Sequence, residues 1–199
     1  MVEQSNTPQR AARGGVIGVA MLAALMGQMQ VSFAQNQAVD PMRACAALAR
    51  IFIPASAIGL PSSGAVVQSS HFTADDAPGN PNGEFCAIRG VVIPASPEAP
   101  NLEFAVNLPS RWNGKMVQLG GGGYDGTLIT GLGPAGMQPA GVPNPLLQGY
   151  VTLGSDGGHK GSFAFDGSFG MNDEALLNYG QQSVKKTHDV AMEIGRAHV

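Results

Sequence analysis

Residues 116–126 read Met-Val-Gln-Leu-Gly-Gly-Gly-Gly-Tyr-Asp-Gly, and this stretch decides the fold class of the chain. Its first four residues predict a short strand, and the glycine run ends that strand. Four consecutive glycines offer no side chain to a core and cost conformational entropy on folding. They do allow backbone N–H groups to converge on one point, as an anion site or an oxyanion hole requires. A flexible surface loop is the alternative interpretation.

Strand signals surround this loop, and each of them is bounded by proline or glycine. The runs are short and either apolar or alternating, which is typical of strands in a partly buried sheet. Strands that lead into a helix indicate an α/β sheet. The predicted strands are residues 85–93, 102–108, 115–119 and 150–153.

Helical periodicity appears at both ends of this pattern. Residues 41–50 predict a short helix with Pro41 in its first turn. Apolar spacing from Asp173 onward predicts a longer helix, with Asn172 or Asp173 as its N-cap. Residues 54–84 are rich in turn-forming residues and are predicted as turns. The apolar stripe of the longer helix is expected at Leu176, Gly180, Val184, Thr187 and Ala191.

The composition narrows the possible function classes. Gly and Pro contribute 28 and 14 of the 199 residues, and only 13% of the residues are charged. These shares exclude a charged disordered tail and a coiled coil. The formal net charge is −3 and no dense Lys/Arg cluster occurs, so nucleic-acid binding is not expected. Two cysteines make no zinc framework, and no metal site is expected in this chain.

The N-terminus has the three parts of a secretory signal. Arg10 and Arg13 precede an apolar run at residues 16–26, and a small-residue site ends at Ala34. The apolar run is shorter than the roughly 20 residues that span a bilayer. Residues 1–34 are therefore predicted as a signal peptide that leaves no stable membrane anchor after cleavage, and the protein as secreted or periplasmic. An uncleaved amphipathic anchor is the alternative.

Export affects the interpretation of the two cysteines. In an oxidising compartment, Cys45 and Cys86 form an even pair that favours a disulfide. Closing the loop between them would stabilise the fold by about 3–4 kcal/mol in the chain-entropy model. Two buried free thiols are the alternative.

No motif of the chain supplies a serine nucleophile. An α/β hydrolase places its serine in a Gly-x-Ser-x-Gly elbow, and none occurs here. The nearest match, residues 166–170, lacks the first glycine and follows no convincing strand. A nucleotide site is also excluded, because the glycine run has neither a P-loop lysine nor the acidic residue of a dinucleotide fold.

Five segments of the chain resemble the tannase and feruloyl esterase family, in the same order and spacing. The resemblance implies a secreted α/β hydrolase that cleaves esters of aromatic acids. Residues 35–192 are then the N-terminal part of an α/β-hydrolase domain, with an incomplete sheet and without the lid domain. The family's N-terminal disulfide fits a pairing of Cys45 with Cys86. The five segments are LPSRWNGK (108–115), QLGGGGYDG (118–126), GYVTLGSDGGH (149–159), NDEALLNY (172–179) and KKTHDVA (185–191).

The resemblance also implies a Ser-His-Asp triad and an acyl-enzyme mechanism. The family's Cys-Ser-x-Gly-Gly elbow, its triad and the lid that holds a calcium ion have no counterpart in these 199 residues. No catalytic residue and no cofactor is therefore expected in this chain, which alone is expected to be inactive. What carries over is the glycine loop, where backbone N–H groups of Gly121, Gly122 and Gly123 would form part of the oxyanion hole.

Four side chains are predicted at the edge of the active site: Tyr124, Asp125, Asp156 and His159. The last two belong to a Ser-Asp-Gly-Gly-His stretch that follows a central strand. A structural role is favoured, in which Asp156 accepts hydrogen bonds from nearby backbone N–H groups and His159 packs against the loop. Direct contact with the substrate is the alternative.

The predicted function is that of a fragment of a secreted carboxylic ester hydrolase acting on a small aromatic ester of the tannin, gallate or feruloyl type. A non-catalytic exported binding module, which uses the glycine loop for an anionic ligand, is the alternative. Residues 193–199 read Glu-Ile-Gly-Arg-Ala-His-Val, which a common short-read sequencing adapter encodes in one frame. They are predicted to be an artefact of that adapter and are excluded from the functional argument.

Overall fold

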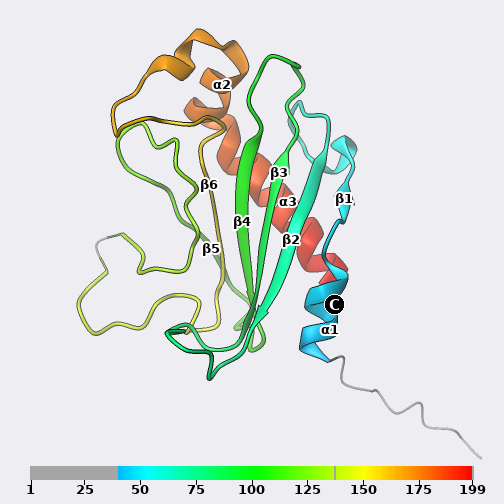
Figure 1. The fold of residues 1–199 in the computed structure, drawn as a ribbon, viewed down its shortest axis with the longest axis vertical. Helices are drawn as coiled ribbons and strands as arrows, with labels where there is room; N and C mark the ends of the chain where they lie inside the picture. Colours follow the sequence, from blue (N-terminus) through cyan, green and yellow to red (C-terminus); the bar gives the residue numbers. More distant parts are fainter. Residues whose placement is uncertain (1–39, 137, 199) are drawn as a thin grey trace, which may run out of the picture. The chain divides into compact units, whose positions relative to one another are not determined.

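A six-stranded mixed sheet is the centre of the fold (Figure 1). The computed structural model describes residues 40–136 and 138–198. Across the sheet the strand order is β1-β2-β3-β4-β6-β5, and all neighbours are antiparallel except β5 and β6, which are parallel. The strands are β1 (Phe52–Ile53), β2 (Ala65–Thr73), β3 (Phe85–Val92), β4 (Leu102–Pro109), β5 (Met116–Gln118) and β6 (Val151–Ser155).

The longest helix covers one face of this sheet. Helix α3 (Ser183–His198) runs behind the strands in Figure 1, and its Val190 and Ile194 join Phe104 and Val106 of β4 in the core. Removing these apolar side chains from water fixes the helix against the sheet. The other helical elements are short: α1 (Pro41–Ala47), η1 (Ala55–Ala57), η2 (Ser168–Met171), α2 (Asp173–Leu177) and the π-helical turn η3 (Asn178–Gln182).

The predicted α/β fold is confirmed, and most predicted elements form close to their expected bounds. The four predicted strands become β3, β4, β5 and β6. Helix α1 starts with Pro41, and its N-cap Asp40 accepts a hydrogen bond from the Met42 N–H. Asn172 is the N-cap of α2, because its side-chain oxygen accepts from the Ala175 N–H at 2.9 Å.

The turn-rich stretch 54–84 also contains a strand that the sequence pattern did not predict, because β2 occupies nine of these residues. Its outer half is polar, and a bulge between Val67 and Ser69 interrupts the alternation that would mark a strand. Ala65 and Val67 face the core, whereas Gln68 and Ser69 are exposed. Pairing with β3 along its length, and not local apolar pattern, makes this segment a strand.

The predicted apolar stripe of the C-terminal helix is correct only in its second half. Thr187 and Ala191 are buried, but the first three members of the stripe are exposed. The π-helical turn η3 inserts an extra residue, which rotates the face before it by about 100° relative to the face after it and explains the exposure of Leu176. Asn178 therefore faces the core in place of its neighbours. Val184 follows this turn and lies on the exposed side of α3. The exposed members are Leu176, Gly180 and Val184.

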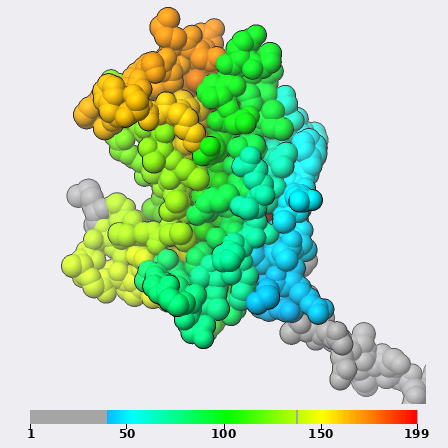
Figure 2. Space-filling model, in the orientation of Figure 1, coloured from blue at the N-terminus to red at the C-terminus, as the bar shows by residue number. Residues whose placement is uncertain are grey.

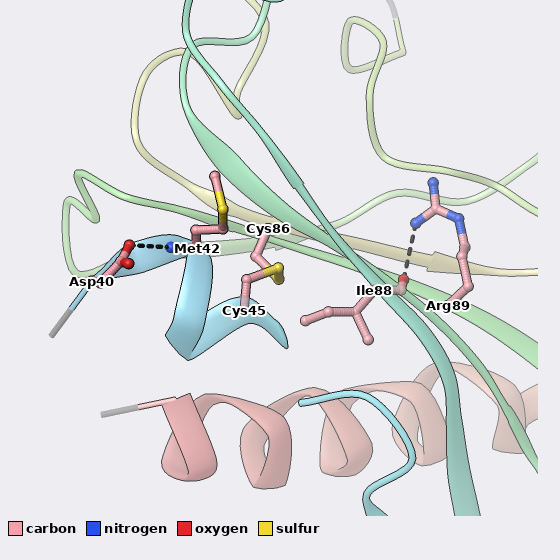
Figure 3. Close-up of a disulfide and its surroundings, with 6 residues drawn as sticks. All are labelled: Asp40, Met42, Cys45, Cys86, Ile88 and Arg89. Atoms are coloured by element: carbon pink, nitrogen blue, oxygen red, sulfur yellow. Dashed lines mark hydrogen bonds between the residues drawn. A yellow bond between two sulfur atoms is a disulfide. The ribbon is translucent and has the colours of Figure 1, made fainter. Parts of the chain in front are cut away.

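The predicted disulfide between Cys45 and Cys86 is present (Figure 3). It joins α1 to β3 with the two Cα atoms 5.5 Å apart, and both cysteines belong to the buried core. Figure 3 places the disulfide and Ile88 on one side of β3 and the Arg89 guanidinium on the other. The bond therefore attaches the N-terminal helix to the sheet.

The described structure includes most of the predicted C-terminal segment, residues 193–199, but not the predicted N-terminal segment. The predicted signal peptide, residues 1–34, lies outside the described residues. Helix α3 continues through His198, and Ile194 within residues 193–198 is fully buried. The adapter origin of this segment stays a prediction. No helix in residues 40–136 and 138–198 is both long and apolar enough to cross a membrane.

Candidate active site

The glycine loop and the Ser-Asp-Gly-Gly-His turn lie at the same edge of the sheet. The loop, residues 120–126, follows β5, and the turn, residues 155–159, follows β6. Because β5 and β6 are parallel, their carboxyl ends meet at one edge, which is where α/β sheets bind ligands. Two backbone hydrogen bonds join the loop to the chain just after the turn: Gly161 N–H donates to the Gly126 carbonyl at 3.1 Å, and Tyr124 N–H donates to the Ala164 carbonyl at 2.8 Å.

The glycine loop presents backbone donors that have no acceptor in the described chain. Leu119 N–H still donates to the Leu153 carbonyl of β6, so the sheet holds the loop's first residue. The next four glycines are exposed. Within residues 40–136 and 138–198, the N–H groups of Gly121, Gly122 and Gly123 donate no hydrogen bond to the protein. Neighbouring N–H groups without a partner can serve as an anion-binding or oxyanion-binding nest.

Asp125 lies inside this loop. Its backbone adopts a φ of 58°, a left-handed conformation that Asp tolerates better than most residues. Its carboxylate fills the space beside Gly121, where an added Cβ would collide with both carboxylate oxygens. Burial raises the pKa of Asp125, although a hydrogen bond from the Thr127 N–H and the charge of His159 act in the opposite direction.

Asp156 organises the turn after β6. The side chain is fully buried, and Oδ1 accepts hydrogen bonds from the Glu103 N–H at 3.0 Å and the Gly158 N–H at 2.9 Å. Burial raises its pKa, and these bonds and Lys160 act in the opposite direction. The Lys160 ammonium lies 3.1 Å from Oδ2 of Asp156 and 2.6 Å from the Glu103 carboxylate. Asp156 therefore accepts backbone hydrogen bonds, as the favoured structural interpretation expects.

His159 is buried in a group of aromatic rings. Its imidazole stacks on Phe169 with ring centres 4.0 Å apart, and Tyr179 lies edge-on at 5.6 Å. Tyr124 of the glycine loop meets Phe169 and Tyr179 edge-on, with centres near 6 Å. Only 2% of His159 is exposed, and neither ring nitrogen has a hydrogen-bond partner among the described residues.

A buried lysine behind the turn is a residue that the sequence reasoning missed. Lys186 of α3 is 1% exposed and donates to Asn178 Oδ1 at 2.8 Å, with Glu174 at 3.4 Å. Burial lowers the pKa of Lys186, and the Glu174 carboxylate partly compensates. The Asn178 side chain packs directly on Gly158, where a Cβ would lie only 2.7 Å from the Asn178 Cβ. Lys186 falls four residues before Val190, so helical spacing from a core residue was the available signal.

The described site offers backbone donors, aromatic surface, the buried Asp156 carboxylate and the half-buried Asp125 carboxylate. In the described ranges, no three His, Cys, Asp or Glu side chains converge as metal ligands. A hollow of about 480 Å³ lies between residues 95–98 and the start of α2, and the glycine loop does not line it. The orange segment around α2 forms one end of the surface in Figure 2 and exposes Phe165 and Met171.

The family profile described as tannase and feruloyl esterase matches residues 86–198. The chain belongs to this family. The matched range contains the glycine loop, the turn after β6 and helix α3, so all predicted oxyanion and active-site-edge residues fall within it, whereas Cys45 lies before it. Membership of the tannase and feruloyl esterase family confirms the resemblance found in the sequence motifs.

Individual relatives agree with the family assignment. An uncharacterized esterase of Agrobacterium fabrum is 50% identical over 147 residues, which are 74% of this chain and 27% of that protein. The mono(2-hydroxyethyl) terephthalate hydrolase of Piscinibacter sakaiensis is 26% identical over 127 residues, or 58% of this chain and 20% of that protein. This chain therefore spans about a quarter of the length of these tannase-family relatives.

Solved structures support the fold independently. Feruloyl esterase B from Aspergillus oryzae superposes with a TM-score of 0.55 at 19% identity, covering 80% of this chain and 30% of that protein. A second esterase from the same organism gives the same TM-score at 18% identity. At these identities the likeness shows the fold alone, which is that of the α/β hydrolases of the tannase family.

Proposed function

We propose that this chain is the N-terminal part of an exported carboxylic ester hydrolase that acts on esters of aromatic acids. The proposal rests on family membership and, within the structure, on one observation: three consecutive glycine N–H groups without acceptors at the ligand-binding edge of the sheet. The buried disulfide is consistent with export, since such bonds persist in oxidising compartments.

In this proposal the glycine loop stabilises the oxyanion of an acyl-enzyme reaction. Attack on the ester carbonyl by a serine places negative charge on the carbonyl oxygen, and the N–H groups of Gly121, Gly122 and Gly123 donate to it. The serine, histidine and aspartate of the triad would come from the part of the protein after residue 199. The aromatic rings of Tyr124, Phe169 and Tyr179 lie beside the loop, which supports an aromatic substrate.

Calcium has no role in the steps proposed for these residues. The described side chains do not fit a calcium site, because no three potential ligands converge. The ion that the family resemblance implies would be held by the lid domain of the complete protein, and would stabilise that domain there.

An assay with two protein forms tests the proposal. The complete protein should hydrolyse methyl gallate or methyl ferulate and be inactivated by a serine-reactive phosphonate, while residues 35–199 alone should show no turnover. A complete protein that folds cooperatively but hydrolyses neither ester would contradict the proposal. Tight binding of an anion by residues 35–199, without turnover by the complete protein, would favour the alternative of an exported binding module.

A further inference from the structure

The environment of His159 is not explained by packing alone. An imidazole that is 2% exposed normally satisfies at least one of its nitrogens with a hydrogen bond. Here both nitrogens lack a partner among the described residues, although the ring is firmly held by its stack on Phe169. Two polar atoms are therefore kept at fixed positions beneath the glycine loop.

Each nitrogen of His159 faces a different part of the site. A Cβ on Gly126, which ends the glycine loop, would lie 3.1 Å from Nε2. A Cβ on Gly157 would lie 3.5 Å from Nδ1 and 3.8 Å from Oδ2 of Asp125. The imidazole and the Asp125 carboxylate thus both border the space beside Gly157, which the missing side chain leaves open.

The other end of the Asp125 carboxylate touches the candidate oxyanion donors. Oδ1 contacts Gly121, the first of the three glycines whose N–H groups are free. The glycines have no side chains that could fix the direction of their own N–H groups. Asp125 is therefore the one side chain of the loop that can order it from the inside, and His159 is its neighbour from β6.

We propose that His159 is a positioning residue for the glycine loop: its imidazole, which borders the same space beside Gly157 as the Asp125 carboxylate, keeps that carboxylate against Gly121 and so fixes the direction of the Gly121–Gly123 N–H groups. This inference deepens the proposed function, because it assigns the support of the oxyanion donors. In this proposal the imidazole acts through Asp125 and not directly on the substrate.

Amide hydrogen exchange in the complete protein tests this coupling without any enzyme assay. His159→Phe keeps the aromatic stack but removes both nitrogens, and Asp125→Asn keeps the size but removes the charge. Each variant should speed exchange of the hydrogen-bonded Tyr124 and Asp125 amides of the loop by about tenfold, because the loop loses one of the two groups that hold its internal carboxylate in place. The double variant should exchange no faster than either single variant, since both changes remove one interaction.

The controls make each outcome decisive. His71→Phe changes an exposed histidine on β2 and should leave the loop unaffected. Exchange of β4, measured in the same samples, reports global stability. Three results would each overturn the proposal. The loop of His159→Phe exchanges at the wild-type rate, the two effects multiply in the double variant, or exchange of the loop and of β4 is accelerated equally.

A kinetic arm separates positioning from simple stability. With methyl ferulate, His159→Phe and Asp125→Asn should lower kcat at least about tenfold and leave KM within about twofold, because oriented donors act mainly in the transition state. An unchanged kcat in variants whose loop amides exchange faster would also overturn the inference. If the wild-type protein hydrolyses no ester, the proposed function fails, and the exchange experiment still decides the role of His159.

Discussion

At the scale of single residues, Gly121 shows how closely the glycine loop is fitted around Asp125. A Cβ at Gly121 would overlap the Asp125 carboxylate, whereas a Cβ at Gly120 or Gly122 would meet no atom within 4 Å. Two glycines that look equivalent in the sequence therefore differ in the space around them. The difference comes from the carboxylate inside the loop and not from backbone conformation.

This contrast predicts the effects of two alanine substitutions. Gly121→Ala should lower the free energy of unfolding by about 1–3 kcal/mol, because the carboxylate must move from a partly buried position. Gly120→Ala is the matched control and should be neutral or stabilise by up to about 1 kcal/mol through the unfolded chain. Urea denaturation of both variants measures the difference. Equal stabilities would show that Asp125 does not occupy the loop.

At the scale of elements, the buried Lys186 joins α3 to Asn178 of η3, which packs on Gly158 of the turn after β6. Lys186→Met keeps the volume but leaves Asn178 and Glu174 without the ammonium, and should cost about 2–4 kcal/mol in stability. Its neighbour Lys185 is more than half exposed and pairs only with Asp189, so Lys185→Met should cost less than about 1 kcal/mol. Denaturant midpoints of the two variants compare them directly. Similar losses of stability in the two variants would contradict a buried network of Lys186, Asn178 and Glu174.

Asp189 gives a pH-dependent prediction for the contact between α3 and the loop before β2. Burial opposes ionisation, but bonds from Lys185, the Gly59 N–H and His188 outweigh it and lower the pKa of Asp189. A lowered pKa in the folded state means stability that is present above the unfolded value of about 3.9 and is lost as pH falls below it. Asp189→Asn should therefore cost about 1 kcal/mol at pH 7 and nothing near pH 2. A loss of stability in Asp189→Asn that persists near pH 2 would contradict the lowered pKa of Asp189.

The elements differ in how far the sequence predicts them. Strands β3, β4, β5 and β6 carry local apolar runs between prolines and glycines, so pattern alone finds them. Strand β2 has a bulge and a polar outer half, and only its pairing with β3 makes it a strand. The π-helical turn η3 has no sequence signature, yet it decides which residues of the last helix face the core.

At the scale of the whole molecule, the candidate site is assembled from segments that are separate in the sequence. The glycine loop and the turn after β6 were each predicted as site elements, and the parallel pairing of β5 and β6 brings them together. The aromatic group around His159 was not predictable, because Phe169 lies in the short helical turn η2 and Tyr179 in the π-helical turn η3, and neither turn has a sequence signature. Family membership alone did not indicate the buried contacts of Asp125 either.

The disulfide gives a prediction for the stability of the whole fold. The double variant Cys45→Ser with Cys86→Ser should lose about 3–4 kcal/mol, because the bond no longer restricts the unfolded chain. Wild-type protein measured in reductant is the matched control and should show the same loss. Equal denaturant midpoints for oxidised and reduced wild-type protein would mean that the pairing of α1 with β3 adds no stability.

The central claim is that the glycine loop donates backbone N–H groups to a reaction oxyanion. The most direct test is kcat for methyl ferulate in the complete protein with Gly122→Pro, which removes one N–H, against Gly122→Ala, which keeps it at a position with open space. With both variants folded, the proline variant should lose about 10²–10³-fold in kcat with little change in KM, and the alanine variant should stay close to wild type. Equal kcat values in the proline and alanine variants would contradict the claim.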